Sequence, residues 1–497
     1  MNAETPILPP LDVLIVGAGI SGIGIAAHLV RECPDKRFVI VERRARPGGT
    51  WDLFRYPGVR SDSDMFTLGY GFAPWRHDKT IVGGDMILDY LNDVVDDHRL
   101  RERMRFGQTV VSANWDSASA LWTAVIEDEA GQRREQSARF LFVGTGYYDY
   151  EDPYDAQIPG LDSFGGLTVH PQFWPKDLDY VGKKVVIIGS GATAATLVPA
   201  MAETAAQVTM LQRTPSWYLT RPALDKVASW LRRLLPDRLA HTLSRIKNVR
   251  MQDFLFSKSR DEPEAVKAYL RKQLEDQLGS DYDREAFTPP YGPWEQRLCL
   301  IPDGDLFAAL NAGKAEIVTG RIAEVDRTGL KLEDGRHLDA DLIVTATGLR
   351  VMLLGKIALT LDGAPIVPGE HYYYRNCMFS NVPNFVAPFG YLNASWTLRI
   401  DLVGEWLGRL LRHMDQRRLD VVTPVLPPDH ALTEVHPFDG FSSGYLARAR
   451  DCIPKSAATA PWQIGMNYTA DRKEMRAAPI DDGVLRFERA PVPASAQ

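Results

Sequence analysis

The chain has 497 residues, of which 45% are hydrophobic and 24% are charged, and its formal net charge is −7. This length allows two or three domains with substantial cores, and the composition is that of an ordinary globular protein. The acidic balance argues against nucleic acid as the main partner, because phosphate binding needs a basic face.

A strand, a glycine-rich turn, a helix and a second strand follow one another near the start of the chain. The β-branched run at residues 12–16 predicts a buried parallel strand, and residues 37–41 predict the next one. A Gly-x-Gly-x-x-Gly turn lies between them, and Glu42 follows Gly22 by 20 residues, which is the spacing of a dinucleotide-binding unit. We expect a cofactor pyrophosphate at this helix N-terminus and a ribose at the acid. The expected binding residues are Gly17, Gly19, Ser21, Gly22 and Glu42.

The next segment, residues 48–62, combines glycine, proline and aromatic residues without a period, which predicts a loop. From the residues alone, Asp62 at its end is interpreted as a loop-capping aspartate. A buried strand that ends in glycines is predicted at residues 140–146.

A second dinucleotide unit begins at residue 184. A predicted strand at residues 184–188 runs into a second glycine turn, whose third glycine is replaced by Ala194. After the next strand, at residues 207–212, Arg213 stands where an acid would bind a free ribose hydroxyl. Arginine can pair with a 2′-phosphate, so this position predicts NADPH over NADH, with a plain surface arginine as the alternative. The expected binding residues are Gly189, Ser190, Gly191, Ala192, Thr193, Ala194, Ala195, Arg213 and Thr214.

A charged, helical insert is predicted at about residues 222–290. Within it, Trp230 to Leu235 form a basic, amphipathic stretch, for which packing on its own domain is favoured over a lid or a membrane-surface helix. A proline-rich loop follows and carries Arg297. The strand that ends in Ala-Thr-Gly at residues 346–348 then indicates a return to the first domain, which is therefore discontinuous.

Two sequence signatures resemble those of the flavin-dependent Baeyer–Villiger monooxygenases. One is Phe164-x-Gly-x-x-x-His-x-x-x-Trp-Pro175, and the other is Gly48-Gly-x-Trp51 followed by Tyr56-Pro-Gly-x-x-x-Asp62. The segment around Arg297 is similar to the branch that contains the thionamide-activating (ethionamide) monooxygenase. The resemblance extends over roughly residues 11–488.

This resemblance implies roles for individual residues. Arg297 is implied to be the catalytic residue and Asp62 an active-site acid that orients it, whereas His170 is expected to be a hydrogen-bonded linker residue. In many relatives a lysine beside that arginine also helps to bind the 2′-phosphate, and Gln296 stands there in this chain. The residues implied to contact FAD or the nicotinamide cofactor are Gly49, Thr50, Trp51, Asp52, Leu53, Arg60, Ser61, Asp62 and Val110.

The motifs and the resemblance together predict an α/β fold with two Rossmann-like dinucleotide-binding domains. An FAD-binding domain is expected at residues 1–155 and 336–497, ending in a C-terminal tail, and an NADPH-binding domain at residues 156–335. The implied reaction inserts one O₂-derived oxygen atom next to a ketone carbonyl, through a peroxyflavin, and gives an ester or lactone with sulfoxidation as a side activity. An S- or N-oxygenating flavin monooxygenase acting on thioethers or thioamides, and a non-catalytic flavin-binding protein, are the alternatives.

The remaining expectations concern setting and partners. The four cysteines lie far apart without a Cys-x-x-Cys pair, so neither a metal site nor dithiol chemistry is expected. The first residues do not resemble a secretory signal and no apolar run has the length of a membrane span, so we expect a cytoplasmic protein, and membrane contact is not expected but stays open. The expected partners are a ketone or thioether substrate and O₂, and the oligomeric state stays open.

Overall fold

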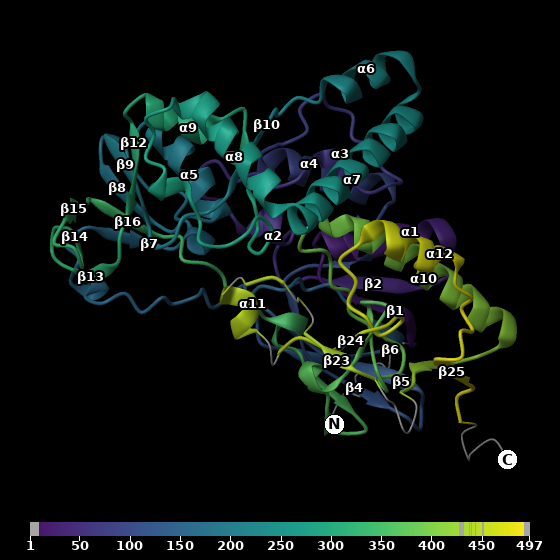
Figure 1. Cartoon of the computed structure of the whole chain (residues 1–497). Coiled ribbons are helices and arrows are strands. Elements are labelled where there is room, and N and C mark those ends of the chain that lie inside the picture. Colours follow the sequence, from purple (N-terminus) through teal and green to yellow (C-terminus); the bar gives the residue numbers. More distant parts are fainter. Residues whose placement is uncertain are drawn as a thin grey trace.

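Two β-sheets organise the computed structural model, and a helical insert bridges the domains built on them (Figure 1). The described residues are 9–426, 432–436, 438, 440–442, 444–449 and 452–491. The last residues of the predicted C-terminal tail, 492–497, lie outside them.

The first sheet is mixed. Its strands are β1 (Leu11–Val16), β2 (Phe38–Val41), β3 (Met104–Arg105), β4 (Gln108–Asp116), β5 (Leu121–Asp128), β6 (Arg133–Val143), β17 (Ala358–Leu361), β18 (Ala364–Pro365) and β21 (Phe385–Val386). They run in the order β18-β17-β4-β5-β6-β1-β2-β3, and β21 also pairs with β6. The centre is parallel, because β1 pairs in parallel with both β2 and β6, whereas β4, β5 and β6 form an antiparallel meander.

Both faces of the first sheet are covered. Val13 and Ile15 of β1 belong to one hydrophobic core, and Leu14 and Val16 belong to the core on the opposite face. This alternation is what a strand buried on both sides requires. On the first of these faces, α1 packs against α4 and α10. The helices of this domain are α1 (Ile20–Glu32), α2 (Thr50–Leu53), α3 (Met65–Leu68), α4 (Gly84–Asp97), α10 (Trp396–Arg417), α11 (Gly444–Arg448) and α12 (Tyr468–Ala477).

The second sheet is entirely parallel. It consists of β7 (Leu167–Val169), β8 (Lys184–Ile188), β9 (Gln207–Gln212), β12 (Ala315–Thr319) and β16 (Leu342–Thr345) in the order β12-β9-β8-β16-β7. One face packs against α5 (Ala192–Ala202) and α9 (Asp305–Asn311). The other face packs against the small antiparallel sheet of β13 (Ile322–Val325), β14 (Gly329–Leu332) and β15 (His337–Asp339).

The insert consists of α6 (Lys226–Leu234), α7 (Asp237–Asp261) and α8 (Pro263–Leu278). It follows β10 (Tyr218–Arg221), which pairs with β11 (Cys299–Pro302) on the far side of the insert. Figure 1 shows α8 beside the second domain and α7 reaching across to α3 of the first. Three further two-stranded sheets complete the fold: β19 (Tyr373–Tyr374) with β20 (Met378–Phe379), β22 (Val421–Pro424) with β25 (Leu485–Glu488), and β23 (Glu434–Val435) with β24 (Ser456–Ala457).

The predicted fold class is confirmed. Parallel strands precede both glycine turns, and the strands expected at 12–16, 37–41, 184–188 and 207–212 correspond to β1, β2, β8 and β9. The chain also returns to the first sheet after β16, because β17 pairs with β4. This return brings segments from both ends of the sequence to the same site.

Candidate functional site

The first glycine turn leaves the N-terminus of α1 open. Gly19 is the N-cap residue, and no side chain accepts a hydrogen bond from the first turn of the helix. A Cβ at Gly22 would lie 1.9 Å from the Gly17 carbonyl oxygen, and one at Gly17 would lie 2.7 Å from that of Gly144. The turn is therefore closely packed behind its glycines, while its free N–H groups fit a bound anion.

A cavity runs from this turn toward the edge of the first sheet. Glu42 is only 5% exposed there, and its carboxylate accepts hydrogen bonds from the Ala18 and Arg44 backbone N–H groups at 2.7 and 2.8 Å. Burial raises the pKa of Glu42, although these two hydrogen bonds oppose the shift. The predicted residues that line this cavity are Gly17, Gly19, Glu42, Gly49 and Val110.

The loop after Gly49 continues the site, with one departure from expectation. Thr50 and Trp51 line a second cavity of about 260 Å³, and the Thr50 hydroxyl lies 2.6 Å from that of Tyr150. Asp52, expected to contact FAD, and its neighbour Leu53 do not line either cavity. Instead, the buried Asp52 carboxylate pairs with three arginines of the same segment, Arg44, Arg46 and Arg55. Burial acts to raise the pKa of Asp52, but Arg44 and Arg46 outweigh it and lower the pKa.

Arg297 and Asp62 meet where the second cavity joins a larger one. Nη1 of Arg297 lies 3.0 Å from Oδ2 of Asp62, and both side chains line both cavities. Each is a little over one-third exposed, so the pair faces open space. Residues 235 positions apart in sequence are thus brought together as an ion pair.

The two loops that carry this pair are held by the surrounding structure. Ser61 is buried and exchanges two hydrogen bonds with Val82, because its N–H donates to the Val82 carbonyl and its hydroxyl accepts from the Val82 N–H. Asp64 caps α3 and accepts a hydrogen bond of 2.8 Å from the Asn248 amide of α7. The loop that carries Arg297 leads directly into β11, and the pairing of β11 with β10 holds this end of the loop.

The larger cavity has a volume of about 830 Å³ and lies between the domains and the insert. Most of its wall area is apolar, although further charged side chains such as Asp64, Lys247 and Lys258 also line it, and Arg297 and Asp62 lie at the junction with the second cavity. This arrangement suits an apolar substrate that reaches the ion pair from the insert side. The apolar residues of the wall are Ile81, Leu219, Leu224, Val227, Met251, Phe254, Leu255, Val266, Leu298 and Leu300.

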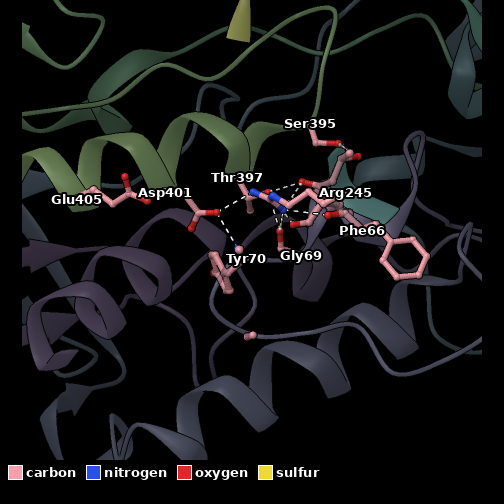
Figure 2. A network of polar contacts seen from close by, with 12 residues as sticks. Phe66, Gly69, Tyr70, Arg245, Ser395, Thr397, Asp401 and Glu405 are labelled. Carbon is pink, nitrogen blue, oxygen red and sulfur yellow. Dashed lines mark hydrogen bonds and ion pairs between the residues drawn. The ribbon is translucent and has the colours of Figure 1, made fainter. Parts of the chain in front are cut away.

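A buried polar cluster fastens the insert to the first domain (Figure 2). Arg245 of α7 donates hydrogen bonds to the carbonyl oxygens of Phe66 and Gly69 at 2.9 and 2.6 Å, and pairs with Asp401 of α10 at 2.7 Å. Asp401 also accepts a hydrogen bond of 2.7 Å from the Gly71 N–H. Because Phe66 and Gly69 follow Asp62 closely in sequence, this cluster fixes the position of α7 relative to the loop that carries Asp62.

The second glycine turn is as tightly packed as the first at its first glycine, where a Cβ on Gly189 would lie 2.3 Å from the Ala346 carbonyl oxygen, but it is more open at its second. Gly191 is the N-cap of α5, again without a side-chain cap, and a Cβ there would meet no atom within 4 Å. Ser190 donates a hydrogen bond of 2.8 Å to the Thr214 carbonyl. Arg213 is exposed directly after β9 and has no ion-pair partner in the described part of the chain. Of the other predicted residues, Gly189 closes the turn at φ 139°, Ala192 and Thr193 line the second cavity, and Ala194 and Ala195 are buried in α5.

Three further residues singled out from the sequence have clear surroundings. Arg60 lines the second cavity but forms an ion pair with Asp305 of α9, so it joins the two domains. His170 accepts a hydrogen bond from the Gln172 N–H at 3.2 Å, and burial lowers its pKa, which fits a linker residue. Burial raises the pKa of the Cys299 thiol to about 12, which leaves it unreactive.

Sequence reasoning did not identify several residues of these cavities. Tyr147, which lies beside Arg297, and Trp396 stack at 5.0 Å between ring centroids. Tyr150 lies beside Thr50, and Lys356 pairs with Asp149 and two further acids at the rim. Tyr147, Tyr148 and Tyr150, which follow the glycines at 144 and 146, were the available signal, because such strand ends lie at the ligand edge of a parallel sheet.

The described residues contain no group of side chains suited to hold a metal ion. Within the same residues, no helix combines the length and apolarity needed to cross a bilayer.

Comparisons with known proteins agree with this geometry. A family model described as flavin-binding monooxygenase-like matches residues 70–352, and a model of NAD(P)-binding Rossmann-like domains matches residues 15–76. The chain is 47% identical over 480 residues to a probable FAD-binding monooxygenase, AlmA, of Acinetobacter baylyi, covering 96% of each chain. It is 45% identical over 488 residues to the FAD-containing monooxygenase EthA of Mycolicibacterium smegmatis, covering 97% of this chain and 99% of that protein. The solved structure of oxidized steroid monooxygenase bound to NADP shares the fold, with a TM-score of 0.77 at 23% identity over 97% of this chain and 100% of that one.

Proposed function

The chain belongs to the flavin-binding monooxygenase-like family, and we propose that it is a Baeyer–Villiger monooxygenase that converts ketones to esters or lactones. The observation that carries this proposal is the Arg297–Asp62 ion pair at the junction of the two cavities. A fixed positive charge is needed there if negative charge develops on an attacking oxygen.

FAD is the proposed cofactor of the first domain and NADPH that of the second. The open N-terminus of α1, the buried Glu42 and the closely packed glycines fit the dinucleotide of FAD. The open N-terminus of α5 and the exposed Arg213 fit NADPH and its 2′-phosphate. When bound and reduced by NADPH, the flavin supplies the activated oxygen.

The side chains of the junction would supply charge and position. Arg297 holds its positive charge against the reacting oxygen, and Asp62 keeps the guanidinium in place through the 3.0 Å ion pair. Tyr147 is positioned beside Arg297, and burial raises its pKa, so it stays protonated at neutral pH. The apolar wall of the larger cavity limits water around the substrate, which strengthens these electrostatic interactions.

The test is product analysis with the FAD-loaded protein, NADPH, ¹⁸O₂ and a panel of ketones and thioethers. We expect ¹⁸O-labelled esters from ketones. Arg297→Ala should lower ester formation by about 10²–10³-fold, the usual loss when one charge-stabilising donor is removed. Flavin content and the rate of flavin bleaching by NADPH under anaerobic conditions should change much less, because Arg297 is assigned to the later oxygen-transfer step.

Arg221→Ala provides the matched control, because Arg221 lines the larger cavity and has no ion pair with Asp62. Ester formation should stay within a few-fold of wild type in this variant. Sulfoxides without any ester from the wild type would replace the proposal by an S-oxygenating monooxygenase. Ester formation at an unreduced rate in Arg297→Ala would remove the assigned role of that residue.

A further inference from the structure

Exposed apolar side chains are concentrated on the insert. Of thirteen large apolar side chains that are well exposed among the described residues, nine belong to residues 222–278. Trp230 and Leu234 of α6 are 59% and 60% exposed, and Phe254 of α7 is 65% exposed. The predicted packing of the Trp230 stretch on its own domain is therefore only partly realised, because Ala228 is buried while its apolar neighbours face outward. Figure 1 shows α6 at the edge of the molecule, beyond α7.

We call the exposed apolar side chains of the insert, taken together, the outer face. Val227, Trp230 and Leu234 follow the three- and four-residue spacing of a single helix face. Val227 also lines the large cavity together with Met251 and Phe254 of α7, so the two helices meet at the cavity mouth. The outer face consists of Leu224, Val227, Trp230, Leu234, Leu239, Leu243, Met251, Phe254 and Tyr269.

The opposite side of α7 is already occupied. Arg245, Ser244 and Asn248 are directed into the first domain, where Arg245 forms the polar cluster with Asp401 (Figure 2). No described segment of the chain covers the outer face, because its side chains are 39–65% exposed. Isolated exposed apolar residues are normal, but their concentration on one helical insert, five of them around one cavity, indicates an interaction surface.

The charge around the outer face is positive. From Leu224 to Tyr269, the span of the outer face, the chain carries ten lysines and arginines against six acidic residues, although the whole chain has a net charge of −7. Lys226, Arg233, Arg238 and Arg250 are exposed and have no ion pair with any described residue. A second copy docked by the same face would bring two such basic segments together, which is unfavourable. An anionic surface is the complementary partner.

We propose that the outer face docks on the surface of an anionic lipid bilayer, with Trp230 and its apolar neighbours in the interface and the basic side chains at the headgroups. A helix with a tryptophan-containing apolar face and a lysine- and arginine-rich polar face lies in the plane of such an interface. The cavity mouth would then open toward the bilayer, and apolar substrate would reach Arg297 without crossing water. This last step rests on the proposed function, whereas the docking does not.

Co-sedimentation of the FAD-loaded full chain with lipid vesicles tests the docking directly. We expect binding to vesicles of phosphatidylglycerol and phosphatidylcholine, weaker binding to phosphatidylcholine alone, and a decrease with rising salt. The double substitution Trp230→Ser and Leu234→Ser should weaken binding at least about tenfold. Turnover of a small, water-soluble ketone should be unchanged, because neither side chain lines the cavity.

The control is the double substitution Leu167→Ser and Val181→Ser, which removes two apolar side chains of similar exposure from the second domain. It should leave vesicle binding unchanged. Equal loss in both variants, or no preference for anionic vesicles, would overturn the proposal. Dimerisation that the Trp230 variant abolishes, without vesicle binding, would assign the surface to a second copy instead. An inactive protein that still binds vesicles would overturn only the proposed function.

Discussion

The two glycine turns share one spacing but differ in how tightly the protein surrounds them. In the first, the third glycine, Gly22, has no room for a Cβ, whereas the second accommodates Ala194 at the same place. The first ends in the buried acid Glu42, and the second ends in the exposed Arg213. An enclosed turn fits a cofactor that stays bound, and an open turn fits one that exchanges in every cycle.

The helices that follow the two turns, α1 and α5, also differ in how they are held by the surrounding structure. In α1, His28 is 3% exposed and lies 3.3 Å from Oδ1 of Asp401 and 3.1 Å from Oε1 of Glu32. Asp401 is also the partner of Arg245, so a buried network ties α1 to α10 and to the insert. The corresponding helix of the second domain, α5, contains no ionisable side chain. The helix of the first unit is thus tied to its surroundings by buried ionisable groups, which the helix of the second unit lacks.

Gly22→Ala should have the largest effect. Its Cβ would lie 1.9 Å from the Gly17 carbonyl oxygen, and this backbone atom cannot move without opening the turn. We expect a loss of stability at or above the upper end of the about 1–3 kcal/mol typical of overpacking, and loss of bound flavin. Thermal unfolding and the ratio of flavin to protein absorbance after gel filtration measure both effects. Wild-type flavin content in this variant would show that the first turn is not enclosed.

The next largest effect is on the pH dependence of the free energy of unfolding, and it arises from His28 in the first dinucleotide-binding unit. Burial disfavours the charged form of His28, but hydrogen bonds and charge from Asp401 and Glu32 prevail and raise its pKa from 6.5 to about 9. Because the folded-state pKa is the higher one, this stabilisation is complete below pH 6.5 and is lost as the pH rises through 9. We expect the free energy of unfolding to fall across this window.

Chemical denaturation at pH 6.5, 8 and 9.5 would measure that decline. In His28→Gln the stability at pH 6.5 should be lower than in wild type, and the decline across the window should be smaller. An identical pH dependence in both proteins would exclude His28 as the titrating group. The Arg245–Asp401 ion pair would remain in the variant.

Arg213→Ala should affect only the nicotinamide cofactor. Loss of a charge-assisted contact with a 2′-phosphate corresponds to about 1.5–3 kcal/mol, or roughly a tenfold to hundredfold rise in KM for NADPH. The KM for NADH should not change, because NADH lacks that phosphate. Arg327→Ala, an exposed arginine elsewhere in the second domain, is the control. Equal rises for both cofactors would place the 2′-phosphate away from Arg213.

Local spacing was enough to predict the glycine turns and the strands before them, whereas Arg297 and Asp62 were singled out only by the family resemblance. Local spacing did not predict contacts set by distant segments. Asp52 is a motif residue, yet three arginines bind it beneath the loop. The Arg245–Asp401 pair joins residues 156 positions apart, and nothing in the insert alone indicates that one side of α7 faces the first domain. Helical periodicity identifies a face but not the surface that covers it.

Gly191→Ala should have the smallest effect on the protein itself. No atom lies within 4 Å of the added Cβ, so the melting temperature should match that of wild type, in contrast to Gly22→Ala. Any rise in KM for NADPH must then come from the cofactor, whose pyrophosphate would approach the N-terminus of α5 at this residue. We expect a rise of several-fold without a change in flavin content. A lower melting temperature would mean that the second turn is as enclosed as the first, and an unchanged KM would place the pyrophosphate elsewhere.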